Sequence, residues 1–250
     1  MRAYRSAIYV IPRVGAPARQ LTARRYDDSQ PAWSPDRRRI AFVRSLSPAT
    51  GYQVWVMSAD GSNARRLTRG RIDGAPDWSP DSRWIAYRGG GDVYVIHPDG
   101  SGRRNVTRNP AGIGAGDPSW SADARRIAFK RSAKPVGTGI YSIGVDGRGL
   151  KRLARDGYDP DWSPDGRRIV FMYRAPFTNA GWQLHTMGPN GGAKRRITRG
   201  GDNVAPHFSP DGRWIAVARN EQVTVMRANG TGIKQLTKRR AGFVIDGIAW

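Results

Sequence analysis

No cysteine occurs in this 250-residue sequence, which excludes disulfide frameworks and thiolate metal sites and leaves cytoplasm and cell envelope both open. The three histidines, His97, His185 and His207, are scattered and lack the spacing of metal ligands. No apolar run reaches the ~18 residues that a membrane-spanning helix requires. The opening MRAYRSAIYVIPRVGAPA is interrupted by Pro12 and Arg13, so we interpret it as a strand rather than an export signal.

Acidic residues are scarce as well. Twenty Asp and Glu stand against 36 arginines and six lysines, which gives a net charge of +22. A field this positive favours contact with anionic polymers or anionic lipid surfaces. The alternative is a composition bias on a solvated exterior, so the placement of the arginines matters.

One pattern returns along the whole chain. PAWSPDRRRIAFVRS begins at Pro31, and close variants begin at Pro76, Pro118, Pro160 and Pro206. The anchor aromatics of these units are Trp33, Trp78, Trp120, Trp162 and Phe208, and Trp250 makes a sixth. Successive anchors are 42 to 46 residues apart, a period typical of repeat architectures.

The register inside each unit predicts four short strands, A to D. Strand A ends at the anchor, and an SPDG-like turn leads into strand B, which carries an isoleucine seven residues after the anchor. Strand C is followed by a second tight turn, Asp-Gly or Asn-Gly, which supplies the positive φ angles of hairpins. Four-stranded units at this period are propeller blades.

We therefore predict an all-β fold: a six-bladed propeller of four-stranded antiparallel blades, in one domain over residues 1–250. The predicted blades cover residues 1–25 plus 246–250, 31–69, 76–108, 118–154, 160–199 and 206–238. The C-terminal GIAW matches a strand A, and its pairing with the N-terminal unit would close the ring and leave no open sheet edge there.

These repeats resemble the TolB-like, WD-like propeller repeats with the signature W-S-P-D-G-x-x-I-A-F, over essentially the whole chain. The resemblance implies an envelope or secreted propeller that works as a protein-interaction platform. Two features depart from full-length TolB: no convincing export signal and no separate N-terminal α/β domain. Fold does not imply function, and a cytoplasmic location stays open.

The repeated residues have structural interpretations. The anchor aromatics are expected in the core between blades rather than on a stacking platform. The Asp of SPDG is expected to cap its own turn, since a calcium site would need several oxygen ligands and the motif offers one carboxylate. Arginines follow the A–B turns and enter strand D, the outermost strand, where charge protects a sheet edge. Specific nucleic-acid binding is disfavoured because the charge is spread round the rim.

Binding is expected on the face of the variable B–C and D–A loops and in the central channel. Acids precede strand A in every unit, where they are either turn residues or ligands for a cation or a basic partner segment: Asp28, Asp73, Asp117, Asp159, Asp202 and Asp246. Asp77, Asp161 and His207 stand one residue before their anchors and are predicted to line the channel. Tyr52, Phe177 and Trp182 are candidate aromatic contacts in the long loops.

Three functions remain open. The first is a non-catalytic scaffold that binds a protein or peptide, without a cofactor beyond a possible channel cation. The second is the propeller of a larger hydrolase or peptidase; the sequence lacks the G-x-S-x-G nucleophile motif, so catalysis would require a further domain. The third is a cationic binder of anionic polymers.

Overall fold

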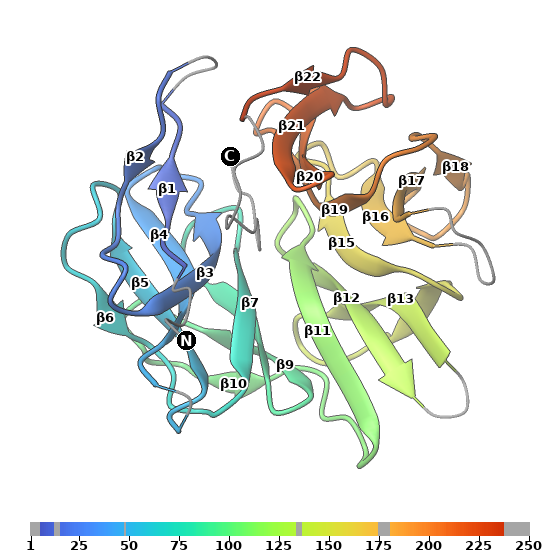
Figure 1. Cartoon of the computed structure of the whole chain (residues 1–250). Helices are drawn as coiled ribbons and strands as arrows, with labels where there is room; N and C mark the ends of the chain where they lie inside the picture. Colours follow the sequence, from blue (N-terminus) through green and yellow to red (C-terminus); the bar gives the residue numbers. More distant parts are fainter. Residues whose placement is uncertain (1–5, 13–15, 48, 134–136, 175–180, 238–250) are drawn as a thin grey trace.

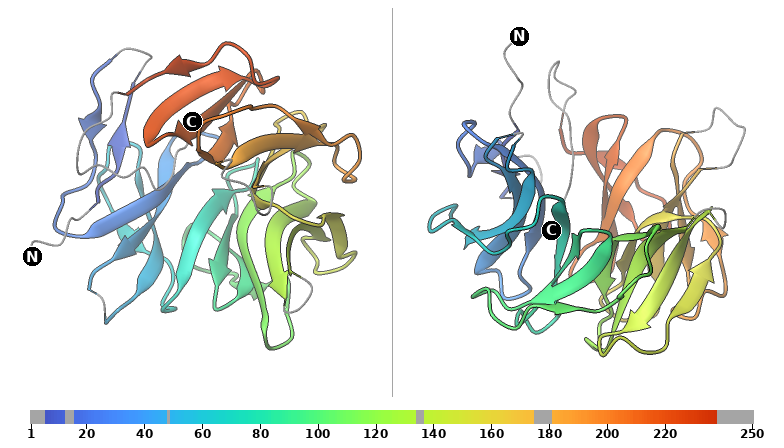
Figure 2. Two further views of the ribbon diagram at one scale, coloured as in Figure 1. Left: turned by 45° about the vertical axis from the view of Figure 1, so that its right-hand side comes forward. Right: turned by 90° about the horizontal axis from the view of Figure 1, so that it is seen from below.

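Short strands and tight turns build the structure. The computed structural model describes residues 6–12, 16–47, 49–133, 137–174 and 181–237. They form five four-stranded antiparallel sheets and one two-stranded hairpin (Figure 1). Successive sheets follow one another around a common centre in chain order (Figure 2). Within the described part, no helix is long and apolar enough to cross a membrane.

Each four-stranded sheet is one blade, with strands A to D running from the centre outward. Blade 1 contains β3 (Asp27–Trp33), β4 (Arg39–Ser45), β5 (Tyr52–Ser58) and β6 (Arg65–Arg66). Blade 2 contains β7 (Asp73–Trp78), β8 (Ile85–Gly89), β9 (Asp92–Ile96) and β10 (Arg104–Asn105). Blade 3 contains β11 (Ile113–Trp120), β12 (Arg126–Ala133), β13 (Gly137–Gly144) and β14 (Lys151–Ala154). Blade 4 contains β15 (Tyr158–Trp162), β16 (Ile169–Tyr173), β17 (Gln183–Met187) and β18 (Arg195–Arg196). Blade 5 contains β19 (Asn203–Phe208), β20 (Trp214–Arg219), β21 (Gln222–Arg227) and β22 (Lys234–Gln235).

The all-β propeller of four-stranded antiparallel blades is confirmed, but the predicted count of six such blades is wrong. The first unit forms only a hairpin of β1 (Tyr9–Val10) and β2 (Arg19–Gln20). Among the described residues, this unit supplies strands C and D alone. Residues 2–4 and 246–250, predicted to add strands B and A, lie outside the described residues, so closure of the ring stays a prediction.

The hairpin nevertheless occupies the position of a blade. The Thr22 hydroxyl accepts a hydrogen bond from the Ile8 backbone N–H at 3.0 Å. The same threonine contact joins strand D to strand C in four of the five complete blades, through Thr68, Thr107, Thr198 and Thr237. Blade 3 has Ala154 at that position and lacks the contact. Ile8 is buried against Ile40 and Phe42 of blade 1, so the hairpin packs as a neighbouring blade would.

Four of the anchor aromatics are buried in the core between blades, as predicted. Trp33 is partly buried, and Trp250 lies outside the described residues. Trp78 packs on Val54 and Val56 of the preceding blade, and Trp120 packs on Val93 of blade 2. Trp162 and Phe208 repeat this arrangement and are also buried. Burying a tryptophan removes a large apolar area from water, so these contacts are a major source of stability between blades.

The SPDG aspartates cap their turns, which confirms the second structural interpretation. Asp165 Oδ1 accepts hydrogen bonds from the Ser163 hydroxyl at 2.6 Å and from the Arg167 backbone N–H at 3.0 Å. These contacts hold the pKa of Asp165 below its usual value. The other four motifs make the same pair of contacts, from Asp36, Asp81, Asp123 and Asp211.

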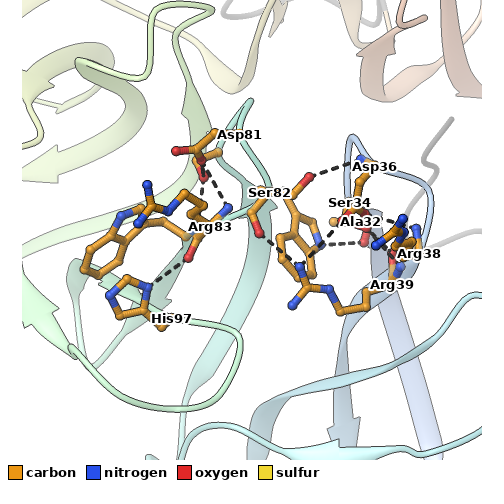
Figure 3. Close-up of polar contacts among 12 residues, drawn as sticks. Ala32, Ser34, Asp36, Arg38, Arg39, Asp81, Ser82, Arg83 and His97 are labelled. Atoms are coloured by element: carbon orange, nitrogen blue, oxygen red, sulfur yellow. Dashed lines mark hydrogen bonds and ion pairs between the residues drawn. The ribbon is translucent and has the colours of Figure 1, made fainter.

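Turn residues also join neighbouring blades, as Figure 3 shows for blades 1 and 2. The Ser82 hydroxyl accepts a hydrogen bond from the Asp36 backbone N–H at 3.1 Å, and the Ser82 carbonyl accepts one from the Arg39 guanidinium at 3.1 Å. The Trp78 indole N–H donates to the Ala32 carbonyl at 3.0 Å. The A–B turns are thus part of the contact between blades as well as connections within them.

Candidate functional site at the propeller axis

A repeated backbone irregularity shapes the inner strands. Three residues before each anchor, a residue takes positive φ, a proline follows, and the pairing of strand A with strand B shifts register. The residues with positive φ are Gln30, Ala75, Asp117, Asp159 and Ala205, with φ between 44° and 53°. An extra residue in one strand re-aims side chains locally, so these bulges place residues of strand A at the axis.

Residues one position before the anchors join each inner strand to the next. Asp77 Oδ2 accepts a hydrogen bond from the Trp120 backbone N–H at 2.8 Å, and Asp161 Oδ2 accepts one from Phe208 at 2.7 Å. The Ser119 hydroxyl accepts one from the Trp162 N–H at 3.0 Å. Each of these side chains therefore holds the end of strand A of the following blade while it faces the axis.

Strand A residues of all five blades line one cavity at the axis, which we call the axial pocket. Its volume is about 100 Å³. Its polar lining residues are Gln30, Asp77, Asp117, Ser119, Asp159, Asp161 and His207. In a protein of net charge +22, four carboxylates are concentrated here. A confined acidic cavity attracts and holds cationic groups.

Asp117 and Asp159 form one electrostatic unit between blades 3 and 4. Burial, together with the charge and hydrogen bond of Asp117, raises the pKa of Asp159 to about 7 against the opposing charge of Lys130. Lys130 Nζ lies 2.8 Å from Asp117 Oδ2 and also stands over the Tyr158 ring. Two neighbouring carboxyl groups of this kind hold a proton near neutral pH that isolated carboxylates would have lost.

Asp77, Asp161 and His207 form the second unit. Burial, together with the charge of Asp161, raises the pKa of Asp77 to about 7. His207 Nδ1 lies 3.4 Å from Asp161 Oδ1. Burial lowers the pKa of His207, but the hydrogen bond and charge of Asp161, with Asp77 and Asp159, outweigh it and raise the pKa above the ordinary value. A protonated imidazole here balances part of the negative charge of the axial pocket.

Three predicted acids lie away from the axis. Asp28 is 1% exposed and forms a bidentate ion pair with Arg44, at 2.6 and 2.7 Å. Asp73 is buried and accepts a hydrogen bond from the Gly70 N–H at 2.8 Å. Asp202 accepts one from the Trp182 N–H at 2.8 Å. Asp73 and Asp202 hold backbone N–H groups of loops, as the turn alternative expects, whereas Asp28 pairs with Arg44 across β3 and β4. Asp117 and Asp159 reach the axial pocket.

The candidate aromatic residues differ in how exposed they are. Tyr52 is 48% exposed at the start of β5 and is available to a partner. Trp182 is partly buried, with its ring edge-on to Tyr158 at 4.9 Å between centroids. Phe177 and Asp246 lie outside the described residues.

A metal site is not supported in the part of the chain that the structure describes, since no group of three His, Asp or Glu side chains there could hold a metal ion. The carboxylates of the axial pocket are instead engaged with backbone N–H groups, His207 and Lys130. The chemistry that the axial pocket offers is therefore hydrogen bonding and charge pairing with a cationic group that lacks strict coordination geometry.

Sequence reasoning missed Gln30, Ser119 and Lys130. Gln30 Oε1 accepts a hydrogen bond from the Ala75 N–H of the next blade at 2.8 Å, which continues the series of contacts around the axis. Gln30 and Ser119 share offsets with Asp117 and Asp161, three and one residues before the anchors. Comparing units by offset rather than by acidity would have found both. Lys130 comes from strand B, and only the fold brings it to Asp117.

The geometry of the repeats agrees with comparison to known proteins. The TolB beta propeller domain matches residues 37–243. The chain belongs to the TolB β-propeller family. A TolB homolog of Chlorobium luteolum is 32% identical over 96 residues, which cover 37% of this chain and 22% of that protein. An uncharacterized Agrobacterium fabrum protein is 31% identical over 114 residues, which cover 43% of this chain and 38% of that one.

Solved structures extend the likeness of fold. A TolB-type protein of Agrobacterium tumefaciens has a TM-score of 0.76 at 21% identity, covering 88% of this chain and 84% of that one. An oligogalacturonate lyase in complex with manganese has a TM-score of 0.64 at 14% identity, covering 94% of this chain and 73% of that one. Identities this low show the fold alone, and the same fold carries both binding proteins and enzymes. The matched segments span less than half the length of either curated relative.

Proposed function

We propose that this TolB-family propeller is a non-catalytic protein-binding scaffold whose axial pocket holds a basic group of a protein partner. The observation that carries the proposal is the concentration of four carboxylates in the axial pocket of a strongly basic protein. Asp117 and Asp161 come from neighbouring blades, so a bound cation would also hold the blades in register.

The size of the axial pocket specifies the kind of contact. A cavity of about 100 Å³ admits one guanidinium or ammonium head group and excludes a folded element. We infer that the partner inserts a single arginine, lysine or chain terminus, and that the surrounding loop face, including Tyr52, supplies the remaining contacts. The family resemblance makes the cell envelope the proposed location.

A labelled Arg-Gly decapeptide tests the axial pocket directly, by fluorescence anisotropy at about 0.15 M salt. Asp161→Asn keeps an acceptor for the Phe208 N–H but removes the charge, so we expect affinity to fall about tenfold. Asp156→Asn removes an exposed carboxylate outside the axial pocket and is the matched control. Equal effects of the two substitutions, or wild-type binding no tighter than to a neutral Ser-Gly peptide, would overturn the proposal.

A further inference from the structure

A groove runs between the outer edges of blades 4 and 5. It has a volume of about 570 Å³ and lies between strand D of blade 4 and the C–D turn of blade 5. Its lining residues are Arg195, Arg196, Ile197, Thr198, Arg199, Arg219, Asn229, Gly230 and Ile233. The sequence predicts basic charge spread round the rim and one face rather than gathered in one groove, but the structure brings four arginines together in this groove.

These guanidinium groups are available to a ligand. Arg195 and Arg199 are exposed. Arg196 donates to the Thr198 carbonyl at 2.6 Å, and Arg219 donates to the Asn203 side-chain oxygen at 2.7 Å. Among the described residues, none of the four forms an ion pair with a carboxylate. Each therefore retains N–H donors in the fork geometry that matches carboxylate, sulfate or phosphate oxygens.

The apolar side chains of the groove are aliphatic, and they stand beside Thr198, Asn229 and Gly230. Ile233 is 49% exposed and Ile197 is half-buried, and among the described residues no aromatic side chain lines the groove. Single-stranded nucleic acids are typically held by aromatic side chains on which bases stack. Apolar methyl groups beside arginines suit a ligand whose anionic groups alternate with C–H surfaces, as in a charged sugar chain.

Exposed basic residues also occur on the rim outside the groove. Strand D of the other blades carries exposed basic residues, Arg65 and Arg66 in β6, Arg104 in β10, and Lys151 and Arg152 in β14. They follow a curved circumference, as the outermost strands in Figure 1 show. A flat lipid surface meets only a short arc of a convex rim, and duplex DNA is too stiff to follow it. A flexible linear polyanion can contact several blades at once.

We propose that the groove between blades 4 and 5 binds a linear anionic polysaccharide, whose carboxylate or sulfate groups pair with Arg195, Arg196, Arg199 and Arg219. This site is separate from the axial pocket and has the opposite charge preference. The remaining strand D arginines increase affinity for longer chains through additional exposed contacts.

The probe is a heparin octasaccharide of defined length. Two double variants are compared, and each removes two positive charges. Arg195→Gln/Arg199→Gln alters the groove, and Arg125→Gln/Arg167→Gln removes two exposed arginines from A–B turns elsewhere. We expect the groove variant to raise Kd at least tenfold and the control variant less than twofold. The slope of log K against log salt should fall by roughly one to two for the groove variant. Thermal melting of both variants establishes that they are folded.

Further binding measurements distinguish a polysaccharide site from adhesion through net charge and from nucleic-acid or lipid binding. Equal losses in groove and control variants would show adhesion through net charge and overturn the site. Tighter binding of oligo-dT or of phosphatidylglycerol vesicles than of the octasaccharide would overturn the polysaccharide assignment. Asp161→Asn should leave octasaccharide affinity unchanged, so a failure of this site and a failure of the axial pocket are told apart.

Discussion

Asp161 of blade 4 contacts His207 of blade 5 at the propeller axis, with 3.4 Å between Oδ1 and Nδ1. The other oxygen of Asp161 accepts a hydrogen bond from the Phe208 N–H at 2.7 Å. One carboxylate therefore both orders the next inner strand and stabilises the protonated imidazole. Structural and electrostatic roles meet in a single side chain, and substitution can separate them.

Asp161→Asn should lower the pKa of His207 while the fold is kept. The amide oxygen still accepts from the Phe208 N–H, but the negative charge that raises the histidine pKa is gone. Titration of the ring protons by NMR measures this, and the two other histidines, His97 and His185, are internal controls. An unchanged His207 pKa would show that Asp77 and Asp159 govern its protonation instead.

Asp77→Asn should flatten the dependence of stability on pH. The folded-state pKa of Asp77, about 7, lies above its ordinary 3.8, so the folded protein binds the extra proton between these values. The contribution of Asp77 to the free energy of unfolding is therefore greatest below pH 3.8. It is lost as pH rises through 7, and the loss is at most about 4 kcal/mol. Asparagine does not titrate and keeps an acceptor for the Trp120 N–H.

Urea unfolding at pH 5 and pH 8 measures this effect in both proteins. The wild type should lose more free energy of unfolding between the two pH values than Asp77→Asn does. Protonation of His207 acts in the same direction, because its raised pKa also gives stability that is lost as pH rises. Identical losses in the two proteins would show that Asp77 is ionised at neutral pH in the folded state.

The sequence revealed the blades because their determinants are local and repeated. The anchor at Trp120, the turn aspartate Asp123 and the isoleucine Ile127 recur at fixed spacing, and each acts within a few residues of itself. The axial pocket depends instead on strand register. Asp28 and Asp73 stand five residues before their anchors and are buried, whereas Asp159 stands three residues before and faces the axis.

The bulge explains why the acidic residues of the sequence do not by themselves show which side chains line the axial pocket. In a regular strand, odd offsets share one face, so residues three and five before the anchor would point the same way. The positive φ at Asp159 and the proline at Pro160 break that alternation. The pairing of Arg44 with Asp28 also depends on the register of β3 against β4, which the bulge shifts.

The buried ion pair of Asp28 and Arg44 predicts that removing one of the two charges lowers the free energy of unfolding more than removing both. Arg44→Met leaves a buried carboxylate without its partner, at a cost of about 3–5 kcal/mol. Asp28→Asn/Arg44→Met removes both charges, and methionine still packs against Phe42 and Trp55, so this variant should be more stable than Arg44→Met. Urea unfolding compares the wild type, the single variants Asp28→Asn and Arg44→Met, and the double variant. A double variant as unstable as the sum of both singles would contradict the argument.

The C–D turns predict a difference between two chemically identical substitutions. Gly191 and Gly100 have φ of 87° and 93°, so alanine at either position is strained by roughly 1 kcal/mol. A Cβ at Gly191 would lie 2.5 Å from the Leu153 carbonyl oxygen of the preceding blade, whereas Gly100 has no atom within 4 Å of such a Cβ. Gly191→Ala should therefore lower the free energy of unfolding by at least about 1 kcal/mol more than Gly100→Ala, because only the first forces blades 3 and 4 apart. Equal losses in urea unfolding would mean that backbone strain alone, and not close contact between blades, requires glycine in these turns.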